Sequence, residues 1–223
     1  SSTYLLVVEV INEKNEVIEK KQRLIFKQGM NPDIQDLKIE NTFASKINNI
    51  DTLKKYIRYL YPIENSSESV YSNNQLNYDS LHYMQKYFYQ FWKSRDIFNP
   101  ELAWLQYLQQ IKKANKEFSS GFIKGFLSDR GRVFLSHGLP NSRSKENHPQ
   151  QFKPFEFWHY YKIGNERDVK FIFSETTPNQ YRMVYSNKEG EVSDQDWSNK
   201  FNQDYYDNNN DNNSPWDYFN NPK

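Results

Sequence analysis

Two apolar patterns near the start of the chain are typical of β-strands. Residues 4–11 are rich in Val, Leu and Ile, and residues 16–27 have apolar residues on both sides of a charged middle. The polar stretch 12–15 lies between them and is typical of a turn, so the sequence predicts a β-hairpin. An isolated hairpin is marginally stable in water. We therefore expect this hairpin to pack on later parts of the chain or to be the edge of a β-rich domain upstream.

The next part of the chain has the spacing of amphipathic helices. Apolar residues recur at i, i+3, i+4 and i+7 in residues 52–60, and Pro62 is expected to end that helix. The same spacing predicts helices over 79–96 and 99–118. Between the first two, residues 64–74 are rich in Ser and Asn and are interpreted as a loop.

After Gly121 the pattern changes to short strands with turns between them. The predicted strands are residues 132–137, 155–161, 169–173 and 181–185. The connections between these strands are short, and such connections permit only antiparallel neighbours. Residues 141–153 are polar and are interpreted as a loop. Both faces of strand 155–161 carry aromatic side chains, so we expect helices to cover one face and the loop or tail to cover the other.

These elements predict an α+β fold in three segments. Residues 1–42 hold the hairpin, a remnant or edge of an upstream β-rich domain. Residues 43–187 hold about three helices followed by a small antiparallel sheet of three or four strands. Residues 188–223 form a polar, Asn-rich tail that ends in an aromatic cluster, Trp216, Tyr218 and Phe219. We expect Trp216 and Phe219 to dock into an apolar groove on this chain or on a partner.

Composition narrows the function classes. The 223 residues carry a formal charge of +1, so nothing indicates a general attraction to nucleic acid, although Arg130, Arg132, Arg143 and Lys145 lie among aromatic residues. Aromatic residues reach 17%, which predicts a core built from large rings. The chain has no Cys and four scattered His, so we expect no metal and no cofactor. No apolar run is long enough to span a membrane.

Three stretches carry a resemblance to a known family. They are Phe91-Trp92-Lys93-Ser94-Arg95-Asp96, then Gly125-Phe126-Leu127-Ser128-Asp129-Arg130-Gly131-Arg132, then His137-Gly138-Leu139-Pro140 with the aromatic strand Phe155–Tyr160. In order and spacing they resemble the GWxTD-domain proteins over roughly residues 43–186. Phe126 stands where that family's motif has Trp, and Ser128 stands where it has Thr.

The resemblance implies an exported protein of the bacterial cell envelope, of a type found in Bacteroidota. It implies a periplasmic or outer-membrane-associated location, with a β-rich domain upstream and, as an option, a lipid anchor on chain that precedes Ser1. The family has no settled activity. Our leading hypothesis is a non-enzymatic scaffold or interaction protein with protein partners, a subunit of a secretion, gliding or outer-membrane assembly complex.

The motif residues also suggest a structural role. We expect an Arg–carboxylate pair to join the helix end Arg95-Asp96 to the corner Asp129-Arg130, because such pairs can be bidentate. Trp92 and Phe126 are expected to cover this latch. The latch as we define it comprises Trp92, Arg95, Asp96, Gly125, Phe126, Ser128, Asp129, Arg130, Gly131, Arg132, Gly138 and Pro140.

Two alternative functions remain open from sequence. One is an envelope hydrolase that uses Asp129 or Glu156 with His137 or His159. The other is a carbohydrate-binding module that uses exposed Tyr and Trp faces. Side chains that converge in one cleft would favour the hydrolase, and a flat row of exposed aromatic residues would favour sugar binding.

Overall fold

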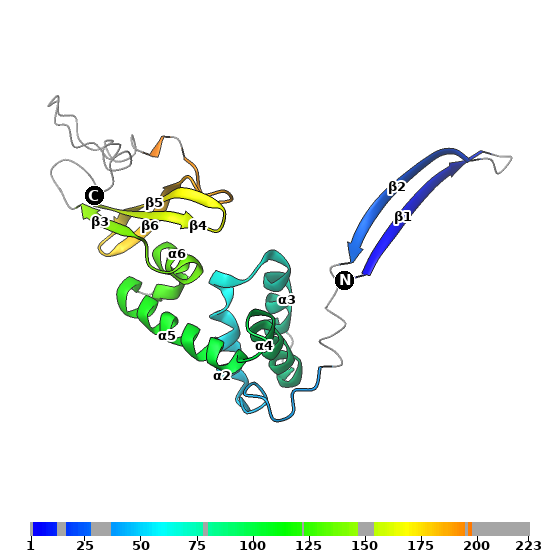
Figure 1. Ribbon diagram of the computed structural model, residues 1–223, viewed down its shortest axis with the longest axis horizontal. Coiled ribbons are helices and arrows are strands. Elements are labelled where there is room, and N and C mark those ends of the chain that lie inside the picture. Colours follow the sequence, from blue (N-terminus) through cyan, green and yellow to red (C-terminus); the bar gives the residue numbers. More distant parts are fainter. Residues whose placement is uncertain are drawn as a thin grey trace. The chain divides into compact units, whose positions relative to one another are not determined.

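The computed structural model describes residues 2–12, 17–27, 37–77, 80–121, 123–146, 154–194 and 196–197. The aromatic cluster Trp216, Tyr218 and Phe219 lies outside the described residues. The chain forms two compact units, Ser1–Trp104 and Leu105–Lys223, and each is described by itself. The described elements are α+β, with helices and antiparallel strands in separate runs along the chain (Figure 1).

The first unit opens with the predicted β-hairpin. Strands β1 (Ser2–Ile11) and β2 (Val17–Lys27) pair antiparallel, from Ser2 opposite Lys27 to Ile11 opposite Val17. The register shifts once, between Val10 and Ile11. A shift of this kind is typical of a β-bulge, which increases the local twist of a ribbon.

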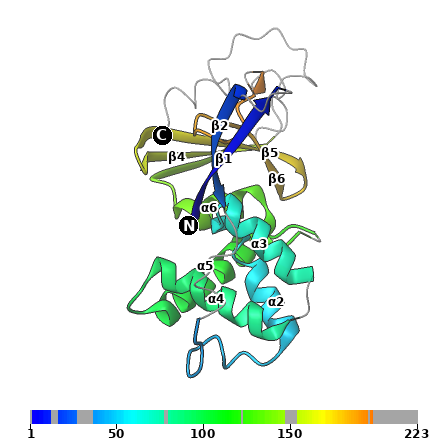
Figure 2. The ribbon, with the colours of Figure 1, turned by 90° about the vertical axis from the view of Figure 1, so that its right-hand side faces the viewer.

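The rest of the first unit is helical. Its elements are α2 (Ile50–Arg58), a 3₁₀ turn (Tyr61–Ile63), α3 (Ser66–Asn77), α4 (Leu81–Arg95) and the first residues of α5 (Pro100–Phe118). Figure 2 shows α2, α3 and α4 as neighbours. Trp104 is the centre of the core, because its ring lies 4.9 Å from Phe88, 4.8 Å from Tyr56 and 5.7 Å from Trp92.

Helix α3 corrects the expectation of a loop over 64–74. A reciprocal pair of bonds starts the helix: Glu68 N–H donates to Asn65 Oδ1, and Asn65 N–H donates to Glu68 Oε2, both at 2.9 Å. This capping box satisfies backbone donors that a helix start leaves open. It allows a Ser- and Asn-rich segment to be helical although the helix buries only Ser72 and Gln75.

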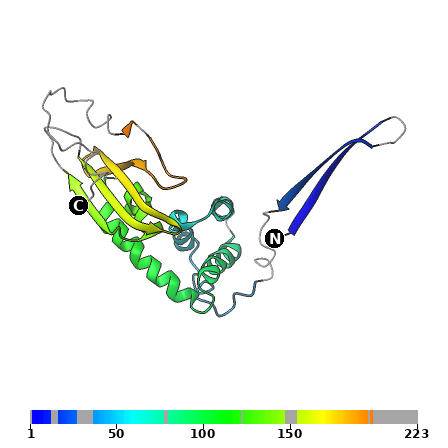
Figure 3. The same ribbon diagram turned by 45° about the horizontal axis from the view of Figure 1, so that its top comes forward.

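The second unit places helices before a four-stranded sheet. After α5 come a 3₁₀ turn (Gly125–Leu127), α6 (Asp129–His137) and the strands β3 (Ser142–Glu146), β4 (Phe155–Ile163), β5 (Glu166–Thr177) and β6 (Gln180–Ser186). The strand order is β3-β4-β5-β6, and every neighbour is antiparallel. Helix α6 lies against the sheet next to β6 (Figures 1 and 3).

Helix α6 corrects the prediction of a strand over 132–137. Ser128 caps its start by accepting from the Gly131 N–H, and Gly138 ends it with φ of +79°. These are typical N-cap and C-cap residues. The buried side chains Arg130, Val133 and Phe134 lie at i, i+3 and i+4, on one helical face. The end signals therefore override the β-branched and aromatic content of the segment.

The fourth strand of the sheet is β3, which was not predicted. It lies within the polar segment 141–153 that was expected to be a loop. It pairs with β4 from Ser142 opposite His159 to Glu146 opposite Phe155. Its polar sequence, Ser-Arg-Ser-Lys-Glu, is compatible with an edge strand, because charged side chains discourage further pairing there.

Both faces of β4 are covered, as predicted. Trp158 is fully buried and contacts Phe118 and Phe173, with ring centroids 5.6 and 5.0 Å away. On the other face, Phe157 belongs to a core cluster that Trp197 completes from the segment after β6. The strand's end departs from the prediction, because Tyr161 is 63% exposed.

Among the described residues, no helix combines the length and apolar character needed to cross a membrane.

Candidate functional site

The motif glycines allow two helical segments and a turn to come very close together. A Cβ on Gly125 would lie 1.9 Å from the Ala114 carbonyl oxygen of α5. A Cβ on Gly131, in α6, would lie 1.7 Å from the Gly125 carbonyl oxygen. Any side chain at either position would therefore push backbone away from backbone, so this corner requires glycine.

Ser128 supplies the hydrogen bonds that hold the corner. Its Oγ donates to the Gly125 carbonyl at 2.7 Å and accepts from the Gly131 N–H at 3.1 Å. Asn115 of α5 adds a third bond, because its Oδ1 accepts from the Phe126 N–H at 3.1 Å. The two bonds of Ser128 use its hydroxyl, and a Thr at this position would supply the same group.

Asp129 connects the corner to the sheet. Its Oδ2 accepts from the backbone N–H of Met183, in β6, at 2.7 Å. Asp129 is also the first residue of α6, where a carboxylate is stabilised by the N-terminal end of the helix dipole. One carboxylate thus fixes the start of α6 against the edge of β6.

Arg130 and Arg143 share one buried carboxylate. Arg130 Nη1 donates to Glu156 Oε2 at 2.7 Å, and Arg143 Nε donates to Glu156 Oε1. Arg130 Nη2 also donates to the carbonyl of Asn179 at 3.1 Å. The side chain of Glu156 is 0% exposed and that of Arg130 is 7% exposed. The pairing compensates for removing these charges from water, which would otherwise be costly.

Aromatic rings surround the two guanidinium groups. Arg130 lies 4.0 Å from the Tyr181 ring centroid and 5.4 Å from that of Phe118. Arg143 lies 5.4 Å from the Trp158 centroid. Rings at this range attract cations through their quadrupoles. From the sequence, Arg143 was named only as one of four cations that lie among aromatic residues, and its partner Glu156 was named as a candidate acid of a hydrolase.

The predicted partner of Arg95 is corrected by the structure. Arg95 binds Glu68 of α3 with both nitrogens, Nη1 to Oε1 at 3.0 Å and Nη2 to Oε2 at 2.9 Å. Its guanidinium carbon also lies 3.3 Å from the Phe91 ring centroid. The expected bidentate geometry therefore occurs inside the first unit with Glu68, while Asp129 accepts a backbone bond inside the second unit.

Asp96 organises the turn between α4 and α5. Its Oδ1 accepts from the N–H of Phe98 at 3.0 Å and from the N–H of Asn99 at 2.8 Å. These bonds satisfy donors ahead of α5 and fix the backbone of the turn. The turn carries Ile97 and Phe98, which are 68% and 88% exposed.

The remaining latch residues are also engaged within their own units. Trp92 packs against Phe91 and Trp104, and Phe126 is buried in the second unit. Arg132 binds Glu191 with both nitrogens, at 2.8 and 2.6 Å.

Gly138 and Pro140 form the connection from α6 to β3. The Gly138 carbonyl accepts from the Tyr160 hydroxyl at 2.9 Å, which ties the helix end to β4. Pro140 is followed by Asn141, whose N–H donates to the His159 carbonyl at 2.8 Å. The turn thereby directs the chain into pairing with β4.

The two histidines lie on opposite faces of the sheet. The His137 ring contacts Tyr160 and stacks on Phe171, and burial lowers the pKa of His137. His159 precedes Tyr160 in β4, so its side chain points to the other face, where Nε2 lies 2.7 Å from Asp168 Oδ1. Within the described residues, no group of three or more His, Asp or Glu could hold a metal ion.

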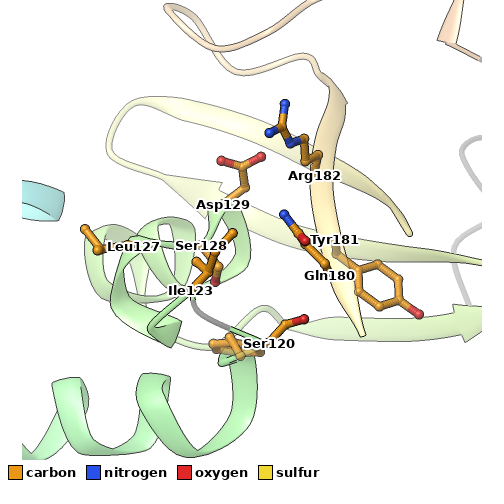
Figure 4. A pocket seen from close by; sticks show the side chains of 9 residues that line it. Ser120, Ile123, Leu127, Ser128, Asp129, Gln180, Tyr181 and Arg182 are labelled. Carbon is orange, nitrogen blue, oxygen red and sulfur yellow. The ribbon is translucent and has the colours of Figure 1, made fainter. Parts of the chain in front are cut away.

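A cavity of about 230 Å³ opens next to the motif corner (Figure 4). Helix α6 and the preceding turn contribute Leu127, Ser128 and Asp129, and β6 contributes Gln180, Tyr181 and Arg182. The remaining lining residues are Phe118, Ser120 and Ile123. In Figure 4 the Asp129 carboxylate, the Gln180 amide and the Arg182 side chain border the same space, whereas the Tyr181 ring points away from it. The sequence did not predict this cavity, because its walls come from three separate segments.

Comparisons with known proteins give one match. A family model described as the GWxTD domain matches residues 24–205. No curated protein and no solved structure matches the chain.

Proposed function

The chain belongs to the GWxTD-domain family, and on that premise we propose that it is a non-enzymatic interaction protein of the cell envelope. The motif residues build a rigid frame, and surfaces that the frame displays bind protein partners. The resemblance to this family supports the proposal of a subunit role in a secretion, gliding or outer-membrane assembly complex. The same resemblance supports the proposal of an exported protein with a lipid anchor.

The observation that carries the proposal is the exposed apolar turn, which we define as Ile97, Phe98 and Leu102. Phe98 is 88% exposed, Ile97 is 68% exposed and Leu102, in the first turn of α5, is 52% exposed. Contiguous exposed apolar side chains on a protein surface typically mark an interaction site. Phe and other aromatic residues are enriched at the cores of such sites.

Motif residues anchor both the backbone of this apolar turn and the helix end that precedes it. Asp96 accepts two backbone N–H groups of the turn, and Arg95 anchors the end of α4 to Glu68. A preordered surface loses less conformational entropy on binding than a flexible one. Burying a side chain such as that of Phe98 stabilises a complex by roughly 1.5–3 kcal/mol. The role of the helix-end residues is therefore to present Phe98.

The polar residues of the corner also support a structural role for the motif. Asp129 accepts from a backbone N–H, and Glu156 accepts from two arginines. Both carboxylates are engaged in bonds that hold elements together, which is an arrangement suited to a frame.

The test is an affinity capture of the full-length protein from its native envelope, with wild type compared with the double variant Ile97→Ser, Phe98→Ser. We expect the variant to lose the co-purified partner while its melting temperature stays unchanged, because both side chains are exposed. Val70→Ser is the matched control, since Val70 is 65% exposed on α3. Retention of every partner by the double variant would contradict the proposal.

A further inference from the structure

Strand β6 is an edge of the four-stranded sheet, and its first part borders the cavity. Among the described strands, the order β3-β4-β5-β6 leaves β6 without a neighbour on one side. The residues of β6 that line the cavity are Gln180, Tyr181 and Arg182. Edge strands carry backbone N–H and C=O groups that can pair with another chain.

The direction of the Met183 N–H indicates which backbone groups face outward. This N–H donates to Asp129, so it points away from β5. Met183 lies opposite Phe173, and Tyr181 lies opposite Glu175 in the same continuous stretch of register. Backbone groups two residues apart in a strand point to the same side. The N–H and C=O of Tyr181 therefore also point away from β5, toward the side on which the cavity lies.

The rest of this edge is already occupied. Asp129 takes the Met183 N–H in the way that a neighbouring strand's carbonyl would. Beyond it, the Ser186 N–H donates to the Val192 carbonyl at 2.6 Å, and Tyr185 forms a bridge with Ser193. The stretch that remains for pairing is short and centred on Tyr181.

The cavity beside Tyr181 combines an apolar wall with polar groups at its border. The apolar residues that line the cavity are Ile123, Leu127 and the buried Phe118. Gln180 and Arg182 extend from β6 on the border, near the carboxylate of Asp129 (Figure 4). This combination suits a ligand that has a backbone to pair with and one apolar side chain to bury.

We propose that this cavity binds an extended peptide segment of a protein partner, which pairs with Tyr181 and places one apolar side chain against Phe118, Ile123 and Leu127. The proposal rests on the proposed function and names a second contact of the same interaction protein. Strand addition of this kind gains affinity from main-chain hydrogen bonds and specificity from the side-chain pocket. Because Asp129 ends the free stretch, the paired segment is only a few residues long.

The first test uses fluorescein-labelled pentapeptides of sequence Val-Thr-X-Thr-Val, with X as Leu, Phe or Asp, titrated with the full chain and followed by fluorescence anisotropy. The Leu or Phe peptide should bind about tenfold more tightly than the Asp peptide, because only an apolar X fits the wall. Methylation of the backbone nitrogen of X should weaken binding by a similar factor, because it removes one main-chain donor. Equal binding of the methylated peptide, or no binding by any peptide, would overturn the proposal.

Variants of the chain locate the site. Leu127→Asp should weaken the Leu peptide about tenfold, because a charge replaces part of the apolar wall. Leu127 is 53% exposed, so the variant should keep the wild-type melting temperature. Leu139→Asp is the matched control, because Leu139 is 66% exposed and does not line the cavity. Equal weakening by both variants would overturn the proposal.

One further variant tests another occupant. If Trp216→Ser in the full chain raises the affinity for the Leu peptide, the chain's own tail competes for the cavity, and the partner peptide is overturned as the main occupant. An unchanged affinity supports the partner. If no peptide binds but partner capture still depends on Phe98, only the peptide site is contradicted. If no peptide binds and capture does not depend on Phe98, the proposed function is contradicted as well.

Discussion

Arg130 and Glu156 form a buried ion pair. Nη1 lies 2.7 Å from Oε2, and the side chains are 7% and 0% exposed. Arg143 binds the second carboxylate oxygen, so one buried charge connects α6, β3 and β4. A network of this kind ties three elements together only while every member is present.

Replacing Arg130 should therefore be strongly destabilising. We expect Arg130→Met to lower the free energy of unfolding by about 3–5 kcal/mol, because it leaves a buried carboxylate with one partner fewer. Urea denaturation measures this difference.

Arg132→Met is the matched control for that change. The Arg132–Glu191 pair is partly exposed, at 27% and 14%, and exposed pairs contribute about 0–1 kcal/mol. If both variants lose a similar free energy of unfolding, burial does not make the Arg130 pair more important for stability than the partly exposed pair.

Asp129→Ala should cost less than loss of the buried ion pair. The structure gives Asp129 a backbone donor, the Met183 N–H, and an unsatisfied donor costs about 1–3 kcal/mol. Asp129→Asn retains an acceptor oxygen and should keep most of the stability. Thermal melting of both variants tests whether Asp129 acts as a backbone acceptor or as a member of a buried salt bridge. In a buried salt bridge, Asp129→Asn would lower the melting temperature as much as Asp129→Ala.

Gly125→Ala should destabilise the second unit by about 1–3 kcal/mol or more, as overpacking against backbone does. The added Cβ would lie 1.9 Å from the Ala114 carbonyl oxygen. Ala114→Gly in the same chain should give no rescue, because the clash involves the carbonyl and not the Ala114 methyl group. Recovery of stability in the double variant, measured by urea denaturation, would show that the side chain was the obstacle.

His137 should make the protein less stable in mild acid. Burial lowers its pKa in the folded state from the ordinary value near 6.5. As the pH falls below that value, the unfolded chain takes up a proton that the folded chain resists, so the free energy of unfolding decreases. His137→Gln should flatten this dependence between pH 7 and pH 5, measured as the difference between variant and wild-type stability at each pH. A parallel decline in both proteins would exclude His137 as its source.

The hairpin, the helices α4 and α5 and the central strands could be predicted because their apolar periodicity is strong. Trp158 is an example, since aromatic residues on both faces of β4 indicated that both would be covered, and its side chain is fully buried. Here local pattern and tertiary packing agree, which is what makes a segment predictable.

Two wrong predictions came from giving side-chain propensity more weight than end signals. Residues 132–137 include Val133 and Phe134, which favour a strand, yet Ser128 and Gly138 define a helix. Residues 64–74 are polar, yet the spacing from Asn65 to Glu68 is that of a capping box, and it could have been recognised in the sequence.

The partners of the charged motif residues could not be derived from spacing. An Arg–carboxylate pair was expected between Arg95-Asp96 and Asp129-Arg130, but Arg95 binds Glu68 and Asp129 accepts from the Met183 N–H. Strand β3 has no apolar pattern at all, and it depends on pairing with β4 and on the bond from Arg143 to Glu156. Such long-range pairings depend on the tertiary fold, and the local pattern of a single sequence does not specify them.

Photo-crosslinking at position 98 in living cells tests the central claim, that the motif frame presents a binding surface, most directly. Phe98→benzoylphenylalanine keeps an aromatic ring at this exposed position, and the same substitution at Val70 is the control. We predict a discrete, heavier adduct with a protein partner at position 98 and none at position 70. No adduct at position 98, or the same adducts at both positions, would contradict the claim.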